Sequence, residues 1–445
     1  MKNLVKKILI CLLAFTMFAA SPLPAFASDY IPAQNSEYVE NFIAVYGLEF
    51  VQNYIRSMEI LPALFDSFPR NRAGEIVYPS DFGGIYINDY GSITILVRGT
   101  LDMSPFGLES LVPHDSDAII IREVNFSYND LTATMNTLND LIFDMFNTTT
   151  TIYAPRWYVD VINNRVVVEL IDLSPEMIDL FKSTVLDSPC IYFAQSPGIT
   201  VLNYSTSAII EFPYELCNYS YTSVDVDSQS MLFVWPGDEI LLRRNGLTVA
   251  RSSAGYRATS HIWGEGFVVA AHSGITFGGG SLRPGDRIYI EYRNFDWRHI
   301  GTVRAESLQS IDAAFVELEP NVIFMCRIQW EVLASWNFTT PVVGNRAYSM
   351  GARSGQRGGR INSLNNTATA IMHGVHIVVH NAVSASIPSI GGDSGGIVFA
   401  RHALGQTTGV MGIVVMQSGA QASIFTRTDE INRRLNLRLP SSQNL

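Results

Sequence analysis

The stretch that decides how the rest of the chain is interpreted is Gly391-Gly392-Asp393-Ser394-Gly395-Gly396, followed by Ile397-Val398-Phe399. A serine and a carboxylate lie side by side between paired glycines, whose backbone can adopt conformations closed to other residues. The apolar run after them predicts a strand. Taken alone, the stretch is most simply a glycine-rich turn. A catalytic role for Ser394 therefore requires partners elsewhere in the chain.

The first partner needed is a base, because a serine hydroxyl is a weak nucleophile until its proton is accepted, and imidazole titrates near neutral pH. His272 follows the apolar run 266–271 and precedes Ser273-Gly274, so it lies where a predicted strand enters a loop. Without a partner, His272 would simply be a hydrogen-bonded residue at a strand end. Six further histidines lie beyond residue 220, at positions 261, 299, 373, 376, 380 and 402.

The second partner needed is a carboxylate that orients the imidazole and stabilises its protonated form. Asp312 directly precedes the apolar run Ala313–Val316. A lone aspartate at that position would more often cap a turn. Asp286 belongs to a Pro-Gly-Asp turn, which explains it structurally, and Asp296 is a weaker candidate.

The three segments together resemble the chymotrypsin-like serine peptidases. Gly392–Gly396, Val268–His272 and Asp312–Val316 follow the His, Asp, Ser order of that family. Met350–Ile361 resembles a glycine-spaced strand region of bacterial α-lytic protease and the streptogrisins. The hairpin Trp157–Leu170 resembles the second half of their long pro-regions.

The resemblance is strong over residues 260–430 and loose over 36–185. It implies that Ser394 is the nucleophile, that His272 acts as general base and then acid, and that Asp312 orients His272. It also implies an oxyanion hole formed by the backbone N–H groups of Gly392 and Ser394. Asp393 would be structural, paired with a buried cationic group, which in relatives is often the mature N-terminus. The implied fold is two six-stranded antiparallel β-barrels with the triad in the cleft between them.

The sequence departs from the family in its cysteines. Relatives usually place a cysteine directly after the histidine, where this chain has Ser273, and often another near the position of Ile390. The disulfides expected in the barrels are therefore missing. After Cys11 in the N-terminal segment, the chain has only Cys190, Cys217 and Cys326, an odd number for an exported protein. A Cys190–Cys217 bridge is possible, and Cys326 is expected to be a small buried residue.

Substrate preference is read from positions that the resemblance places at the specificity pocket. Pro388 stands six residues before Ser394, where trypsin-like members hold an acidic residue. Val415, Met416 and Gln417 lie in a segment expected to line the cleft, and they are bulkier or more polar than the small residues common in relatives. No charged residue is placed to bind a charged substrate side chain. An uncharged, apolar preference is therefore expected.

The N-terminus has the pattern of an export signal. Lys2, Lys6 and Lys7 form a basic start, residues 8–20 an apolar run, and Ala25-Phe26-Ala27 a small-x-small cleavage site. The apolar run is too short for a membrane-spanning helix, so cleavage is favoured over an uncleaved anchor. Since no later segment is long and apolar enough to cross a membrane, the protein is expected to be secreted and extracellular, without membrane attachment after signal cleavage.

Charge divides the exported chain into two parts. Residues 28–220 hold 8 Lys and Arg against 25 Asp and Glu, a balance of −17. Residues 221–445 hold 19 basic residues, all arginine, against 16 acidic ones, a balance of +3. The contrast fits two parts that dock, or simply two solvated surfaces. No basic run with interleaved aromatic residues indicates nucleic-acid binding.

The acidic part shows helix followed by hairpin twice, which indicates an α+β region of two related units. A helix is predicted over Ser36–Leu61, interrupted at Gly47, and a hairpin over Phe82–Val97. A second helix over Leu131–Phe146 precedes the Trp157–Leu170 hairpin, and another helix begins at Ser174-Pro175-Glu176. No nucleophile, metal-ligand spacing or phosphate loop occurs in this part.

The basic part begins after a polar linker near residues 215–230. It consists of short apolar runs separated by turns such as Pro236-Gly237-Asp238 and Arg283–Asp286, a pattern typical of an all-β barrel or sandwich. Its one predicted helix, over Thr428–Leu437, closes the chain.

The sequence thus predicts a signal peptide over residues 1–27, a pro-region over 28–222 and a serine peptidase domain over 223–445. The pro-region would assist folding and inhibit the enzyme, since domains rich in non-local strand pairing fold slowly. Its partners would be a protein or peptide substrate and its own pro-region. A monomer without cofactor or metal is expected. The alternative is a catalytically silent secreted binding protein on the same two barrels.

Overall fold

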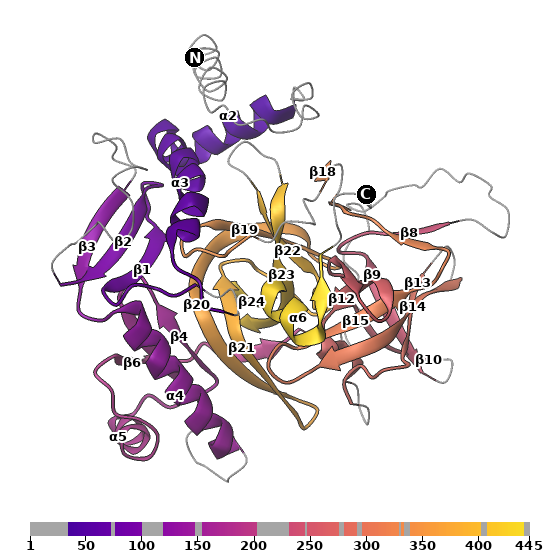
Figure 1. The fold of residues 1–445 in the computed structure, drawn as a ribbon. Helices are drawn as coiled ribbons and strands as arrows, with labels where there is room; N and C mark the ends of the chain where they lie inside the picture. The colour runs from indigo at the N-terminus through magenta and orange to yellow at the C-terminus, as the bar shows by residue number, and fades with distance from the viewer. Residues whose placement is uncertain are drawn as a thin grey trace.

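The chain forms two adjoining β-barrels and an α+β part that packs against one of them (Figure 1). The computed structural model describes residues 34–72, 76–99, 119–146, 154–202, 231–244, 247–275, 280–291, 296–328, 331–332, 339–401 and 407–439. None of the helices in these ranges is long and apolar enough to span a membrane.

The first barrel is a ring of six antiparallel strands. The strands form one sheet of order β10-β9-β13-β14-β15-β12-β11-β25. β10 and β11 are two halves of one bent strand, because Ala254 N between them donates to Asp238 O and Gly255 N donates to Val268 O. Through this bent strand the ring closes. Its elements are β9 (Glu239–Arg244), β10 (Leu247–Ser253), β11 (Arg257–Ser260), β12 (Gly264–Val269), β13 (Arg287–Glu291), β14 (Trp297–Ser307), β15 (Ala313–Leu318) and the added β25 (Leu437–Arg438).

The second barrel closes through strand pairing alone. Its order is β19-β22-β23-β24-β21-β20, and β19 also pairs with β20. All six pairings are antiparallel. The prediction of two six-stranded antiparallel barrels is therefore confirmed. The strands are β19 (Arg346–Gly351), β20 (Gly355–Met372), β21 (Val375–Ala385), β22 (Ile397–Arg401), β23 (Thr407–Ser418) and β24 (Ala422–Arg427).

The unbroken apolar runs of the first barrel are explained by burial on both faces of its central strands. Successive side chains of a strand point to opposite faces. On β12, Phe267 and Val269 fill the interior of the first barrel, whereas Val268 belongs to a second core shared with the other barrel. On β15, Val316 and Phe315 divide in the same way. The strand ends that carry the predicted His272 and Asp312 are thereby fixed from both sides.

Shorter elements complete the C-terminal part. β8 (Leu232–Val234) pairs in parallel with β16 (Val322–Phe324), and β17 (Arg327–Ile328) pairs with β18 (Glu331–Val332). The predicted closing helix is α6 (Thr428–Leu435). It ends two residues earlier than expected, because Asn436 adopts a left-handed conformation and Leu437 enters β25.

The α+β part consists of two units with one strand pattern. In each, a hairpin is followed by a third strand parallel to its second strand. The third strands are the feature that the sequence patterns did not predict. The first unit has α2 (Gln34–Tyr46), α3 (Leu48–Ser67), β1 (Phe82–Ile87), β2 (Ile93–Arg98) and β3 (Ile119–Val124). The second has α4 (Tyr128–Phe146), β4 (Arg156–Asp160), β5 (Arg165–Leu170), α5 (Pro175–Thr184) and β6 (Ile191–Gln195).

The first predicted helix is two helices. Gly47, between α2 and α3, has φ of 84°, a left-handed conformation that glycine adopts without strain. Phe42 and Phe50 nevertheless come together across this break, with ring centroids 6.2 Å apart.

The α+β part joins the second barrel through strand pairing. β4 pairs with the long strand β20, so that β4, β5 and β6 extend the sheet of the barrel, which with the short strand β7 (Ile199–Val201) has ten strands. Figure 1 shows this sheet continuing from β20 towards β6. β7 pairs antiparallel with β23. The two parts of the chain therefore share hydrogen-bonded backbone.

The structure does not use disulfides in the described residues. Cys190 and Cys326 are both buried and free. Cys11 and Cys217, the latter a possible partner of Cys190, lie outside the described residues.

Candidate active site

His272 and Asp312 are placed at neighbouring strand ends of the first barrel. His272 lies on the short 3-10 helix η4 (Ala271–Gly274), directly after β12, and Asp312 directly precedes β15. β12 and β15 pair with each other, so the two residues leave the sheet side by side. Asp312 has φ of 47°, which turns the chain sharply into the strand.

The structure brings the three predicted residues into one hydrogen-bonded line. His272 Nδ1 lies 2.5 Å from Asp312 Oδ2, and His272 Nε2 lies 2.7 Å from Ser394 Oγ. Asp312 Oδ1 also accepts a hydrogen bond of 2.8 Å from the backbone N–H of His272. All three side chains are essentially buried. Water therefore does not compete with these bonds, and the carboxylate fixes the orientation of the ring.

The aspartate is also tied to the second barrel. Just before it, Ser310 N donates to Val378 O at 2.7 Å, and His380 N on β21 donates to Ser310 O at 2.8 Å. The loop that carries Asp312 is thus a bridge between the barrels. This bridge sets the distance between His272, on one barrel, and Ser394, on the other.

The loop of Ser394 depends on glycine at two positions. Gly392 has φ of 101° and Gly395 has φ of 80°, so a side chain at either position would be strained. The loop is also held from the first barrel. Ser252 Oγ donates to Ser394 O at 2.6 Å, and Ser253 Oγ donates to Gly392 O at 2.8 Å. These bonds fix the backbone on both sides of Asp393.

Asp393 is buried and fully bonded by groups close to it. Its Oδ1 accepts from the backbone N–H groups of Arg353 and Ser354, at 3.0 and 2.9 Å. Its Oδ2 accepts from Ile390 N at 2.9 Å and from the hydroxyl of Ser354. These four donors are uncharged. The predicted pairing of Asp393 with a cationic group is not needed to satisfy the carboxylate in this structure.

The expected oxyanion hole consists of the backbone N–H groups of Gly392 and Ser394, both in this loop. Among the hydrogen bonds of the described residues, neither N–H donates to another group of the loop, whereas those of Asp393 and Gly395 are used, donating to Ile390 O and Val414 O. Two N–H groups of one tight turn can bind the same oxygen atom.

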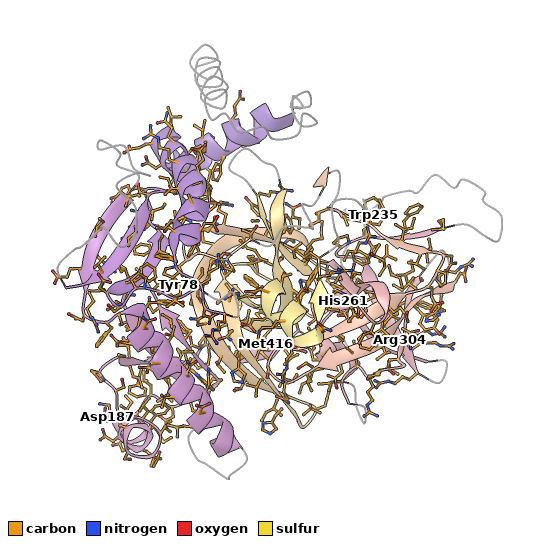
Figure 2. The ribbon with its side chains drawn as sticks, in the orientation of Figure 1. Tyr78, Asp187, Trp235, His261, Arg304 and Met416 are labelled. Carbon is orange, nitrogen blue, oxygen red and sulfur yellow. The ribbon has the colours of Figure 1, made fainter. Side chains whose placement is uncertain are left out.

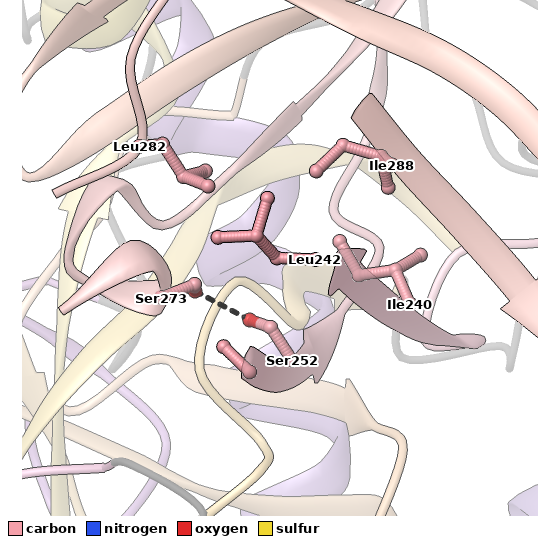
Figure 3. Close-up of a pocket in the computed structure, with 7 residues that line it drawn as sticks. Ile240, Leu242, Ser252, Ser273, Leu282 and Ile288 are labelled. Carbon is pink, nitrogen blue, oxygen red and sulfur yellow. Dashed lines mark hydrogen bonds between the residues drawn. The ribbon is translucent and has the colours of Figure 1, made fainter. Parts of the chain in front are cut away.

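A small space beside the site is bordered by two serine side chains. Ser252 Oγ and Ser273 Oγ lie 2.6 Å apart, as Figure 3 shows. Around them are the apolar residues Ile240, Leu242, Ala250, Leu282 and Ile288, and the space holds only about 10 Å³. Ser273 occupies the position after the histidine at which the family resemblance leads one to expect cysteine.

The rival carboxylates have structural partners. Asp286 forms an ion pair of 2.6 Å with Arg244, and Asp296 pairs at the surface with Arg298. His272 Nδ1 lies against Asp312 instead. Of the other histidines, His380 has its pKa lowered by burial, and His299 lies 3.4 Å from Glu319. His402 lies outside the described residues.

The predicted pocket residues differ in their burial. Val415 and Met416 are fully buried, Gln417 is half-buried, and Pro388 is exposed. In Figure 2, Met416 lies within the second barrel. β23 is paired with β22 up to Ile413, and beyond that point its free edge takes β7. Val415–Gln417 therefore lie along the edge that receives another strand.

That strand leads to the group that sequence reasoning missed. Leu202, directly after β7, is buried, and its carbonyl oxygen accepts a hydrogen bond from Ser394 Oγ. The α+β part thus reaches the predicted nucleophile itself. A short apolar run after Pro197-Gly198 was the only sequence signal of this strand.

Among the described residues, no group of three or more His, Cys, Asp or Glu side chains is arranged to hold a metal ion. The site consists of a hydroxyl, an imidazole and a carboxylate in one hydrogen-bonded line, and the N–H groups of Gly392 and Ser394 belong to the turn that carries the hydroxyl. Such a set can transfer a proton from serine to imidazole while it stabilises a negative oxygen.

Comparison with known proteins gives one family model and several structures. Residues 129–196 match the family model of a Pro-like C-terminal domain, which corresponds to the second α+β unit. No curated protein sequence matches the chain.

The similar structures are bacterial proteases. Nocardiopsis protease is 19% identical, and the match covers 47% of this chain and 100% of that one, with a TM-score of 0.35. Cellulomonas bogoriensis chymotrypsin is 20% identical, with the same coverages and a TM-score of 0.36. Thermobifida fusca protease A is 17% identical, again over 47% and 100%, with a TM-score of 0.36. The fold assignment rests on the strand pairings described above.

Proposed function

We propose that the chain is the precursor of a secreted serine endopeptidase. The observation that carries this proposal is the continuous line of bonds from Asp312 through His272 to Ser394, at 2.5 and 2.7 Å. In this role Ser394 is the nucleophile, His272 the general base and acid, and Asp312 the residue that orients His272.

The reaction follows from these positions. Ser394 Oγ attacks the carbonyl carbon of a peptide bond while His272 Nε2 takes its proton. The oxygen of the tetrahedral intermediate is bound by the N–H groups of Gly392 and Ser394. His272 then gives the proton to the leaving amine, and water hydrolyses the acyl-enzyme by the same route. Asp312 remains ionised and stabilises the imidazolium in both halves of the reaction.

The α+β part serves as a pro-region that blocks the site. β7 lies on the edge of β23, and Leu202 contacts Ser394, so a substrate strand has no room there. Inhibition of this kind requires firm docking of the rest of the pro-region. Two clusters of contacts supply it.

The first cluster surrounds Arg156, which is 6% exposed. Its guanidinium donates to Asn366 Oδ1 and Ser363 Oγ on β20 and to Ser418 Oγ on β23, at 2.8, 3.0 and 3.1 Å. It also pairs with Glu169 at 3.2 Å. One pro-region side chain therefore connects two strands of the second barrel, and Ser418 is itself paired with β7.

The second cluster involves two arginines of the second barrel. Arg346 donates to the hydroxyl of Tyr46 and lies 5.5 Å from the ring centre of Phe42. Arg360 pairs with Asp89 at 3.0 Å and lies 5.3 Å from the ring centre of Phe50. Arginine over aromatic faces, with acidic partners, fits the contrast between a basic domain and an acidic pro-region.

The same contacts suit a role in folding. The barrels are built from non-local pairings, such as β9 with β13 and β19 with β22, whose formation is slow. β4 presents a ready strand to β20, the longest strand of the second barrel. The export signal over residues 1–27 and the monomeric state belong to the proposal as sequence-based expectations.

A fluorophosphonate probe, which reacts with activated serines, tests the function. The secreted, processed protein should be labelled, Ser394→Ala should lose all labelling, and Ser386→Ala, at an exposed serine of the same domain, should keep it. Absence of labelling in processed wild-type protein would favour the alternative, a silent binding protein on the same barrels.

A further inference from the structure

We propose that the second barrel carries a binding site for a guanidinium group, which Arg156 fills in the intact chain and which an arginine of the substrate fills in the processed enzyme. The side chains of Asn366, Ser363 and Ser418 form this site. The inference rests on the proposed function and adds to it a second point of recognition, away from Ser394. The substrate class that it names is peptides with an arginine several residues before the scissile bond.

The first observation is that every donor of the Arg156 guanidinium has an acceptor. Arginine has five N–H donors in a planar fork. Nε and Nη2 donate to Asn366 Oδ1 at 3.0 and 2.8 Å, Nη2 also donates to Ser363 Oγ at 3.0 Å, and Nη1 donates to Ser418 Oγ at 3.1 Å. The fifth donor, on Nη1, faces Glu169 at 3.2 Å. Four of the five bonds are therefore made to the second barrel, and one is made within the pro-region.

The second observation is that the barrel itself orients two of the acceptors. Asn366 Nδ2 donates to Ser363 O and Ala382 O, both at 3.1 Å, so the amide oxygen is turned towards the guanidinium. Ser363 Oγ donates to this oxygen at 3.1 Å, which leaves the lone pairs of the hydroxyl for an incoming N–H group. Asn366 and Ser363 are almost completely buried. Since none of these bonds involves the pro-region, the acceptors keep their orientation when Arg156 leaves.

The chemistry of the acceptors selects arginine. They are uncharged oxygens on two strands, and the wide fork of a guanidinium spans them with charge-assisted hydrogen bonds. A lysine ammonium presents its three donors from a single atom and does not match this spread. Citrulline has the size of arginine, but a carbonyl oxygen replaces one of its nitrogen atoms. It therefore has no charge and turns an acceptor towards the acceptors of the site.

Release of the pro-region opens the site. Arg156 leaves with β4 and Glu169 with β5, whereas Asn366 and Ser363 stay on β20 and Ser418 stays on β23. The edge of β20 that pairs with β4 becomes free at the same time. The processed enzyme is thus left with a set of oriented acceptors that have lost their donors, beside an open strand edge.

The place of Ser418 on β23 determines which part of a substrate reaches the site. Gly395 N donates to Val414 O and Val414 N donates to Gly396 O, so Val414 lies where β23 passes the serine loop. Ser418 is about four residues further along the strand, a distance of ~13 Å at ~3.3 Å per residue. β7 lies along this part of β23 and runs towards Ser394. A substrate with the same direction reaches the site with a residue about four to six positions before the scissile bond.

The first experiment measures substrate preference. Processed wild-type enzyme is assayed on fluorogenic peptides that share one cleavage sequence and carry arginine, citrulline, lysine or methionine at the fourth, fifth or sixth residue before the scissile bond. We expect kcat/KM for arginine to exceed that for citrulline by at least about 10-fold at one of these positions, the effect of roughly one hydrogen bond to a charged group. Equal values for arginine and citrulline at every position would overturn the inference.

The second experiment removes the acceptors one at a time. Ser418→Ala and Ser363→Ala should each lower the ratio of kcat/KM between the arginine and citrulline peptides. Ser386→Ala, at an exposed serine directly after β21, should keep the ratio of wild type. Because the ratio compares two substrates on one variant, a general loss of activity or of folded protein cancels. An unchanged ratio in both acceptor variants would place the arginine elsewhere and refute the proposal.

The third experiment does not depend on catalysis. A fluorescent peptide with the sequence of residues 154–161, which includes Arg156, is titrated with the processed protein and followed by anisotropy. The same peptide with citrulline at the arginine position is the control. We expect the arginine peptide to bind at least about 10-fold more tightly. Equal binding of the two peptides would contradict a guanidinium site.

The outcomes separate the inference from the function beneath it. If the fluorophosphonate labels Ser394 but arginine and citrulline peptides are cut and bound equally, the function stands and the guanidinium site falls. If the processed protein is neither labelled nor active on any peptide, the function falls, and the titration still decides whether the site exists.

Discussion

The hydroxyl oxygens of Ser252 and Ser273 lie 2.6 Å apart, one on β10 and the other next to the predicted catalytic histidine. Ser252 also bonds to Ser394 O, so the pair connects the histidine side of the site with the serine loop. In chymotrypsin-like relatives a cysteine is expected at the position of Ser273. The hydrogen bond between Ser252 and Ser273 lies where a disulfide could form.

We therefore predict that Ser252→Cys with Ser273→Cys forms a disulfide under oxidising conditions. Closing a loop across the 21-residue separation should stabilise the folded domain by about 3 kcal/mol. Thermal unfolding of the oxidised and reduced double variant measures the gain, with Ser273→Cys alone as control. Equal melting temperatures in the two redox states would show that the geometry does not suit the bond.

Asp312→Asn should lower kcat about 10⁴-fold while leaving KM nearly unchanged. The amide cannot stabilise the imidazolium and favours the wrong tautomer of His272. Steady-state kinetics on a peptide substrate, with Asp296→Asn at the surface as control, tests this. Activity within tenfold of wild type would mean that another carboxylate orients His272.

Asp393→Ala should destabilise the serine loop. The change leaves the four donors from Ile390, Arg353 and Ser354 without their acceptor in a buried place. Each unsatisfied buried group costs about 1–3 kcal/mol, so a loss of several kcal/mol is expected. Denaturant unfolding gives the loss, and fluorophosphonate labelling reports whether Ser394 keeps its position. Full labelling with unchanged stability would contradict this role.

Arg156→Met should weaken docking of the pro-region, because it removes the bonds to β20 and β23 and leaves Glu169 buried without its cation. Removing one partner of a buried ion pair costs about 3–5 kcal/mol. The paired change Arg156→Met with Glu169→Leu should recover part of that loss. The measurements are the yield of active secreted enzyme and the unfolding free energy of the Ser394→Ala precursor. A paired variant less stable than Arg156→Met alone would refute the role assigned to the ion pair.

The stability of the first barrel should depend on pH through Asp238. Burial raises the pKa of Asp238 to about 6, although the hydrogen bond that its carboxylate accepts from Trp235 N lowers this pKa. Since the folded pKa exceeds the unfolded one, the folded state holds the proton more tightly. This contribution is fully present below about pH 4 and is lost as the pH rises through about 6.

Asp238→Asn removes this titration while its side-chain oxygen can still accept the bond from Trp235. Relative to the variant, the wild-type protein should lose less than about 3 kcal/mol between pH 4 and 7, since one pKa unit is worth ~1.4 kcal/mol and Asp238 is only partly buried. Unfolding free energies of both proteins across this range test the prediction. Parallel pH profiles would exclude Asp238 as the source.

The sequence was informative where local chemistry determines structure. The apolar runs and turns predicted an all-β barrel or sandwich. The resemblance carried by the segments around His272, Asp312 and Ser394 implied two barrels with a site between them. Glycines in the serine loop carry positive φ at Gly392 and Gly395, as a tight turn requires. Each of these features is visible within a few residues of chain.

The features that were missed depend on contacts between distant segments. Ser394 and Leu202 are 192 residues apart, and neither Leu202 nor Ser252 belongs to a recognisable motif. β3 has a half-exposed pattern, and its parallel pairing with β2 is decided by tertiary packing and not by local propensity. The same holds for Arg156, whose partners on β20 and β23 are recognisable only in the folded chain.

The strand β7 and the Ser394 loop that it blocks belong to one molecule. Dilution therefore does not weaken inhibition while the chain is intact, but it does so once the chain is cut. While the chain is intact, the blocking segment is present at a fixed effective concentration, which for tethered groups is in the millimolar range. After the tether is cut, occupancy depends on the concentration of free pro-region around the enzyme. A crowded site of synthesis would therefore keep the peptidase silent, and spreading into a larger volume would switch it on.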